Sequence, residues 1–126
     1  MSAASITGLD HVQVAAPPGC ETEARHFYGR LLGLPEIDKP EELRARGGLW
    51  FACGAQQLHV GVTPDFTPAG KAHPAFRVRP GGLEPLAARL AESGSAVRWG
   101  EAIAGVSRVV VDDPWGTRLE LLAPGE

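Results

Sequence analysis

The second half of the chain repeats the pattern of the first, and this repeat restricts the fold more than any other feature of the sequence. When the two halves are aligned, DHVQVAAPPG lies over AHPAFRVRPG, so that His11 falls on His73. With the offset shortened by a single position, QQLHVGV lies over TRLELLA, so that His59 falls on Glu120. A nearly constant period of this kind is typical of a fold built from copies of one supersecondary unit.

Each copy has the same order of predicted elements, which is a strand, a helix and then three strands. Alternating apolar residues indicate the strands, and apolar residues at helical spacing indicate the helices. In the first copy we expect strands over 6–16, 48–53 and 56–62 and a helix over 21–32. The segment 34–46, which Pro40 interrupts, is ambiguous, and its part 41–46 fits either a strand or a short helix. In the second copy we expect strands over 73–79, 97–99, 106–111 and 118–123 and a helix over 83–93. The sequence therefore predicts an α+β fold made of two βαβββ modules.

Length and composition limit the domain count and the partners. We expect one domain over 1–126, with module one at about 6–63 and module two at about 72–124. A net charge of −3 without a basic stripe argues against nucleic acid, and no apolar run approaches the roughly 18 residues of a membrane span. The segment MSAASITGLD lacks the basic and apolar regions of a secretory signal. Two cysteines without a CxxC motif suit a reducing compartment, so we expect a cytoplasmic protein.

Four polar residues interrupt the apolar pattern at matching places in the two copies: His11, His59, His73 and Glu120. A carboxylate among leucines is costly to bury alone, and a cation is its simplest partner. Three imidazoles and a carboxylate suit Zn, Ni, Co, Mn or Fe(II), and any two of the histidines with the glutamate make the 2-His-1-carboxylate set. A lone histidine on a strand is usually an ordinary core or surface residue, and only the repetition favours ligands here. His59 has the weaker case, because an open site needs only three protein ligands.

Neighbouring positions on the same strands predict a substrate pocket. Gln13 and Arg77 alternate in step with the histidines, so we expect both side chains to face the cavity. Arg77 is suited to a substrate carboxylate or phosphate, although a surface arginine at a strand end is the simpler interpretation. His26 aligns with Ala88 and serves as a contrast, expected at the surface. The segment DDPWG is expected to be a turn with a purely structural role.

On these residues the sequence resembles the vicinal-oxygen-chelate superfamily, the group of glyoxalase I, fosfomycin-resistance proteins, extradiol dioxygenases and bleomycin-resistance proteins. The resemblance rests on LDHVQV, HFYGRLLGL, QLHVGV, AHPAFRV and DDPWGTRLELLAP, and it covers nearly the whole chain. It implies paired βαβββ modules in a curled mixed sheet around a central cavity. It also implies a divalent metal held at the positions of His11, His59, His73 and Glu120. Members often form homodimers, in which the metal site can take one module from each chain.

The resemblance leaves the reaction open. Glyoxalase I has a carboxylate where this chain has His59, and its glutathione-binding arginine corresponds to Ala15. The first hypothesis is a metal-dependent lyase, isomerase or dioxygenase acting on a small oxygen-rich metabolite, with Glu120 also serving as a base. The alternative is a non-catalytic binder of bleomycin-resistance type, which sequesters a drug or metabolite. Four aromatic residues are candidates to line its pocket, although most of them are expected in the core: Trp50, Phe51, Trp99 and Trp115. A third possibility is a metal with only a structural role.

Overall fold

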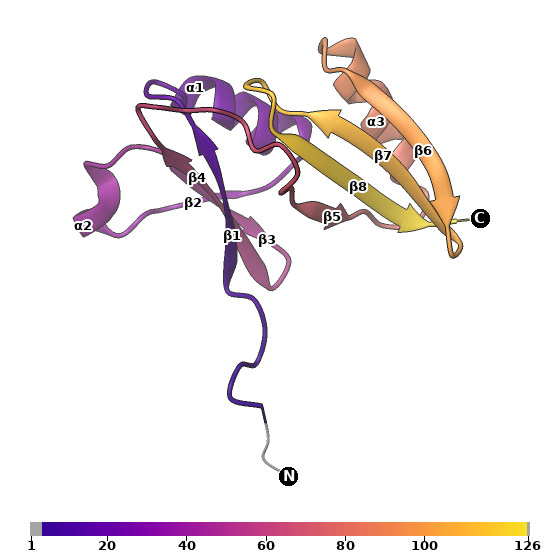
Figure 1. Ribbon diagram of the computed structural model, residues 1–126, viewed down its shortest axis with the longest axis horizontal. Coiled ribbons are helices and arrows are strands. Elements are labelled where there is room, and N and C mark those ends of the chain that lie inside the picture. Colours follow the sequence, from indigo (N-terminus) through magenta and orange to yellow (C-terminus); the bar gives the residue numbers. More distant parts are fainter. Residues whose placement is uncertain (1–3, 126) are drawn as a thin grey trace.

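The computed structural model describes residues 4–125, which form two four-stranded sheets lying side by side (Figure 1). The ends of the predicted domain, residues 1–3 and 126, lie outside the described residues. Within 4–125 no helix is both long enough and apolar enough to cross a membrane.

The first sheet has the strand order β1-β4-β3-β2, and β1 runs parallel to β4. Its module contains β1 (His11–Ala16), α1 (Glu21–Ala24), the π-helix η1 (Arg25–Leu31), β2 (Glu36–Ile37), α2 (Glu41–Arg44), β3 (Leu49–Cys53) and β4 (Gln56–Val62). The segment 41–46, which fitted either a strand or a short helix, therefore begins with the short helix α2, and the strand β2 precedes it.

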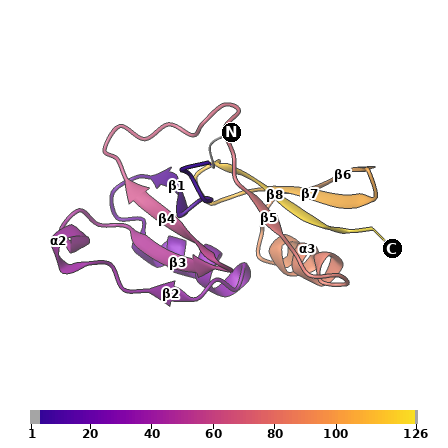
Figure 2. The same cartoon turned by 90° about the horizontal axis from the view of Figure 1, so that it is seen from below.

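The second sheet has the equivalent order β5-β8-β7-β6, with β5 parallel to β8. Its module contains β5 (Ala75–Arg77), α3 (Leu83–Glu92), β6 (Val97–Ile103), β7 (Val106–Asp112) and β8 (Arg118–Pro124). The long segment from β4 to β5 joins the two modules (Figure 2). Gln13 pairs with His59 in the first sheet, and Ala75 pairs with Glu120 in the second. The register thus reproduces the sequence repeat, and the predicted α+β fold of two βαβββ modules is confirmed.

The helices bury the apolar positions that their spacing predicted. Ala24, Phe27, Tyr28 and Leu31 are all buried, and their helical segment packs with β3. The helix widens to π geometry after Ala24, as shown by the bond from the Leu32 N–H to the Phe27 carbonyl. In the second module α3 buries Leu90 against its sheet. One core thus runs beneath both sheets.

Two predicted strands are longer than the real ones. The strand over 6–16 begins only at His11, because its partner β4 begins at Gln56 and its last hydrogen bond in this direction joins the Gln57 N–H to the Asp10 carbonyl. The strand over 73–79 is reduced to Ala75–Arg77, since Pro74 and Pro80, near its two ends, have no N–H to donate to a ladder. The strand expected at 97–99 instead extends to Ile103 along its hairpin with β7.

The DDPWG segment forms the turn between β7 and β8, and it also ties the two modules together. Oδ1 of Asp113 accepts hydrogen bonds from the backbone N–H groups of Trp115 and Thr117, at 3.0 and 2.9 Å. Its Oδ2 accepts a bond of 2.8 Å from the hydroxyl of Tyr28 on η1. The turn therefore has the predicted structural role, and the contact with Tyr28 adds a buried polar link between modules.

Candidate metal centre

Two of the four predicted ligands meet on the face of the first sheet that points away from the core. His11 begins β1, His59 lies on β4, and their rings stack with centroids 4.0 Å apart. Trp50 on β3 stacks on the other side of His59, also at 4.0 Å. The stack follows from the register, because Trp50 and His59 are cross-strand partners whose side chains share a face.

His59 is held in its neutral form. The residue is 4% exposed, and burial disfavours the imidazolium. Burial is thus the main cause that lowers the pKa of His59, and the neighbouring His11 lowers it further. Nε2 of the neutral His59 donates to the side-chain oxygen of Gln57 at 2.8 Å, so Nδ1 is the ring nitrogen that keeps its lone pair. A neutral imidazole is the form that ligates metals.

The other two predicted ligands meet on the second sheet. His73 precedes β5, Glu120 lies on β8, and Nε2 of His73 is 3.7 Å from Oε2 of Glu120. The other carboxylate oxygen, Oε1, accepts a hydrogen bond of 2.7 Å from Nη2 of Arg108 on β7. This bond is the main cause that holds the pKa of Glu120 below its usual range, so the carboxylate is ionised at neutral pH.

The donor atoms of these pairs suit a divalent cation. Nδ1 of His73 donates to the Lys71 carbonyl at 2.7 Å, and Nδ1 of His11 lies 2.9 Å from Oδ2 of Asp10. An oxygen acceptor on Nδ1 leaves Nε2 with its lone pair, the usual arrangement of ligating histidines. In a tetrahedral Zn site neighbouring ligand atoms lie about 3.3 Å apart. The 3.7 Å between Nε2 of His73 and Oε2 of Glu120 is close to that separation.

One chain does not bring the two pairs into one cluster. Among residues 4–125 no group of three or more His, Cys, Asp or Glu side chains is placed to hold a metal ion. The His11–His59 pair belongs to the sheet of the first module, and the His73–Glu120 pair belongs to the sheet of the second. Within residues 4–125 the four predicted ligands therefore form two separate pairs, one on each sheet, and each pair is a candidate half-site.

A hollow of about 620 Å³ lies over the first half-site. Its lining includes His11, Gln13, Lys39, Arg46, Trp50 and His59. Gln13 folds across Gly61, where even a Cβ atom would come within 2.7 Å of its side chain. Arg77 lies at the end of β5, exposed, on the same face of the second sheet as Glu120. Both predicted substrate-binding residues thus lie on the faces that carry the ligand pairs.

Comparison with known proteins identifies the family. No family model matches the chain, and no curated protein matches it. Among solved structures, a protein from Bacillus anthracis assigned to the glyoxalase family is 48% identical to this chain. The alignment covers 98% of this chain and 99% of that one, with a TM-score of 0.90. This chain belongs to the glyoxalase family.

More distant structures share the fold of this glyoxalase family chain. A glyoxalase/dioxygenase from Nostoc punctiforme is 23% identical over 99% of this chain and all of its own, with a TM-score of 0.77. The fosfomycin resistance protein FosX from Listeria monocytogenes is 15% identical over 94% of this chain and 93% of its own, with a TM-score of 0.76. Membership of the glyoxalase family, shown by the similarity to the Bacillus anthracis protein, confirms the predicted resemblance to the vicinal-oxygen-chelate superfamily.

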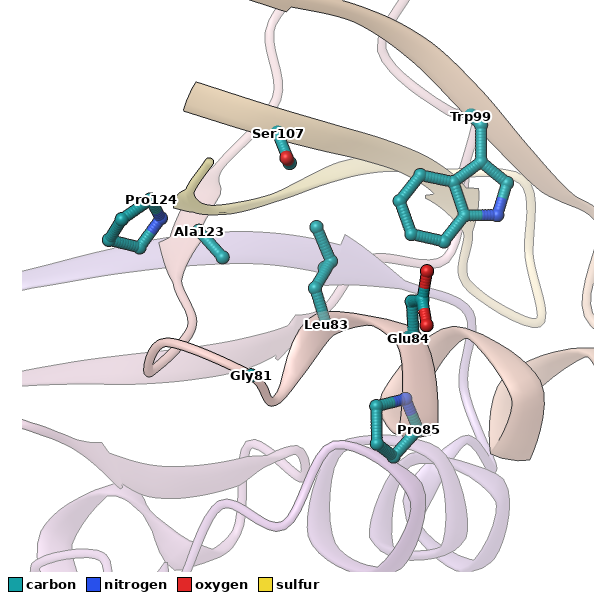
Figure 3. Close-up of a pocket in the computed structure, with 8 residues that line it drawn as sticks. All are labelled: Gly81, Leu83, Glu84, Pro85, Trp99, Ser107, Ala123 and Pro124. Atoms are coloured by element: carbon teal, nitrogen blue, oxygen red, sulfur yellow. The ribbon is translucent and has the colours of Figure 1, made fainter. Parts of the chain in front are cut away.

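The four aromatic residues predicted for a binding pocket separate in the structure. Phe51 is fully buried in the core, and Trp115 packs against that core. Trp99 is 54% exposed and lines a different pocket, of about 380 Å³, beside the start of α3 (Figure 3). That pocket lies on the helix side of the second sheet, away from Glu120, because Trp99 shares its face with Val109. Of the four, only Trp50 borders the histidines.

Two residues of the site have roles that the sequence does not predict. The sequence marks Trp50 only as a pocket aromatic, although it sits opposite His59 on a neighbouring strand. Arg108 carries no motif, and a charged residue on a strand ordinarily means a solvent-facing position. What could have identified Arg108 is its position along the strand. β7 pairs with β8, and Arg108 lies two residues from Val110, the partner of Glu120. His26, the contrast case, is exposed as predicted.

Proposed function

We propose that this glyoxalase family chain is a divalent-metal-dependent enzyme that acts on a small oxygen-rich metabolite by bidentate chelation. The ion, one of Zn, Ni, Co, Mn or Fe(II), would be held by His11, His59, His73 and Glu120. The observation that carries the proposal is the pair formed by Nε2 of His73 and Oε2 of Glu120. These two atoms lie 3.7 Å apart, farther than in an ordinary hydrogen bond and close to the separation of neighbouring ligand atoms on an ion.

We propose further that two chains complete each site. The half-sites of one chain lie on separate sheets, so a whole ligand set needs the first module of one copy and the second module of another. A dimer with twofold symmetry would form two such sites at once, because each chain offers both halves.

When bound, the ion would polarise two neighbouring substrate oxygens and stabilise the oxyanion that forms on them. This serves lyase, isomerase and dioxygenase chemistry alike. The amide of Gln13 would orient the substrate from the first module. The guanidinium of Arg77 would bind an anionic group of the substrate from the second. Once it leaves the ion, Oε2 of Glu120, the oxygen that Arg108 does not hold, would accept a proton from the substrate.

Metal content tests the ligand set. The wild-type protein, loaded with each cation and dialysed, should retain about one ion per chain, as expected for one ligand set per chain in a twofold dimer. Glu120→Gln should lose most of it, because the amide is a far poorer ligand than the carboxylate. His26→Gln changes an exposed histidine outside the site and is the matched control. Equal retention in all three proteins would overturn the proposed site.

Mixing two defective chains tests the sharing. His59→Ala damages the first half-site, and Glu120→Gln damages the second. After random reassortment half of the dimers are mixed, and each of these has one site with both halves intact. Metal binding should therefore return to about a quarter of the wild-type sites. A site within one chain would give no recovery.

A sequestering role is the second candidate, favoured by the hollow over the first sheet and by Trp50 within it. Stacking on the free face of a partly buried aromatic ring needs no ion. Binding of small oxygen-rich ligands that survives complete metal removal would support this role. Binding that depends on metal supports the enzyme.

A further inference from the structure

The carboxylate of Glu120 is anchored at one oxygen only. Nη2 of Arg108 donates to Oε1 at 2.7 Å, while Oε2 stays on the side of His73. Both partners of this ion pair are half-buried, with side-chain exposures of 25% for Arg108 and 18% for Glu120. A charge-assisted bond between partly desolvated groups holds a rotamer better than a surface ion pair does.

The neighbouring strands of the sheet place Arg108 beside Glu120. Arg108 on β7 pairs with Leu122 on β8, one step along the same face from Glu120. On its other side lies Gly100 of β6, where an added Cβ would stand 3.1 Å from Nη1. Because Gly100 has no side chain, the guanidinium of Arg108 fits beside β6. From there it extends across β7 to the carboxylate of Glu120.

From this geometry we infer that Arg108 is a positioning residue that makes Glu120 a ligand through one oxygen. The inference rests on the proposed metal site. A carboxylate can bind a cation through one oxygen or through both, and the choice changes the coordination number. With Oε1 held by Arg108, only Oε2 is free to reach an ion beside His73. Arg108 would thereby keep a coordination position open for the substrate.

The test measures Co(II) binding by Arg108→Ala, with Arg98→Ala as the matched control. Arg98 lies on the neighbouring strand and pairs with Asp112 at 3.1 Å, away from Glu120. Loss of a residue that orients a ligand typically costs about 10- to 100-fold in metal affinity. We expect a loss of this size for Arg108→Ala, no loss for Arg98→Ala, and partial recovery for Arg108→Lys, which retains a donor.

The visible spectrum of bound Co(II) supplies a second measurement. Release of Oε1 should raise the coordination number and weaken the d–d absorption in Arg108→Ala. Wild-type affinity and spectrum in that variant, with Glu120→Gln still defective, would overturn the role of Arg108 and leave the metal site standing. Equal Co(II) binding by the wild type and Glu120→Gln, or none by the wild type, would overturn both.

Discussion

Replacing Tyr28 by phenylalanine removes a single oxygen atom and should weaken the junction between the modules. The hydroxyl of Tyr28 is fully buried and donates to Oδ2 of Asp113, which is 5% exposed. The two backbone donors to Asp113 both reach the other oxygen, Oδ1. In Tyr28→Phe, Oδ2 therefore loses its protein donor while it remains out of water.

The expected cost follows from the charge on the acceptor. A hydrogen bond to a charged group contributes roughly 1.5–3 kcal/mol, and an orphaned buried acceptor keeps its desolvation penalty. We expect the free energy of unfolding at neutral pH to fall by about 2 kcal/mol. For a chain of this length that corresponds to a drop in Tm of roughly 6–10 °C.

The cost should also depend on pH. Burial raises the pKa of Asp113, and the hydrogen bond from Tyr28 partly offsets this by stabilising the carboxylate. Without that bond the pKa of Asp113 rises further, so the folded protein binds a proton that the unfolded chain has already released. Its free energy of unfolding then falls as pH rises through this interval. The cost of Tyr28→Phe is thus smallest in acid, where Asp113 is protonated in both states, and reaches its full value above the folded-state pKa.

Urea denaturation at acid and neutral pH measures both effects. Asp113→Asn is the control background, because an amide at this position carries no charge. In that background Tyr28→Phe should cost only about 0.5–1.5 kcal/mol, with no pH dependence. If the cost is the same at both pH values and in both backgrounds, the buried carboxylate is not what Tyr28 stabilises, and the reasoning is refuted.

Three further substitutions test the first sheet. Gly48→Ala should cost at least about 4 kcal/mol or prevent folding, because at φ +85° its Cβ would stand 2.1 Å from the backbone oxygen of Val60. Gly54→Ala, at φ +57° with open space around it, should cost only about 1–2 kcal/mol, and thermal denaturation of both variants checks the difference. The metal-free protein should lose stability between about pH 7 and pH 5, because the unfolded chain protonates His59 more readily than the folded protein does. In denaturation at several pH values His59→Gln should flatten that slope, and an unchanged slope would contradict the assigned burial effect.

Much of the fold could be predicted from periodicity. The strand Gln56–Val62 and the helix from Leu83 have the predicted starts, because alternation and helical spacing are local properties of the sequence. Gln13, which alternation places on the face of the ligands, lies opposite His59 in the register. The errors lie at strand ends. There the length of a strand depends on what its partner offers, and Ile6 has no partner to pair with.

The sequence by itself determined which side chains share a face, and hence which residues are candidate ligands. Only the tertiary structure decided that the candidate ligands form two pairs on separate sheets, and that Arg108 holds one oxygen of Glu120. The physical reason is range. The face of a sheet on which a side chain lies follows from alternation with residues two or four positions away. The placement of the modules depends instead on contacts between distant residues, such as Tyr28 and Asp113, which are 85 residues apart. No local pattern encodes such a contact.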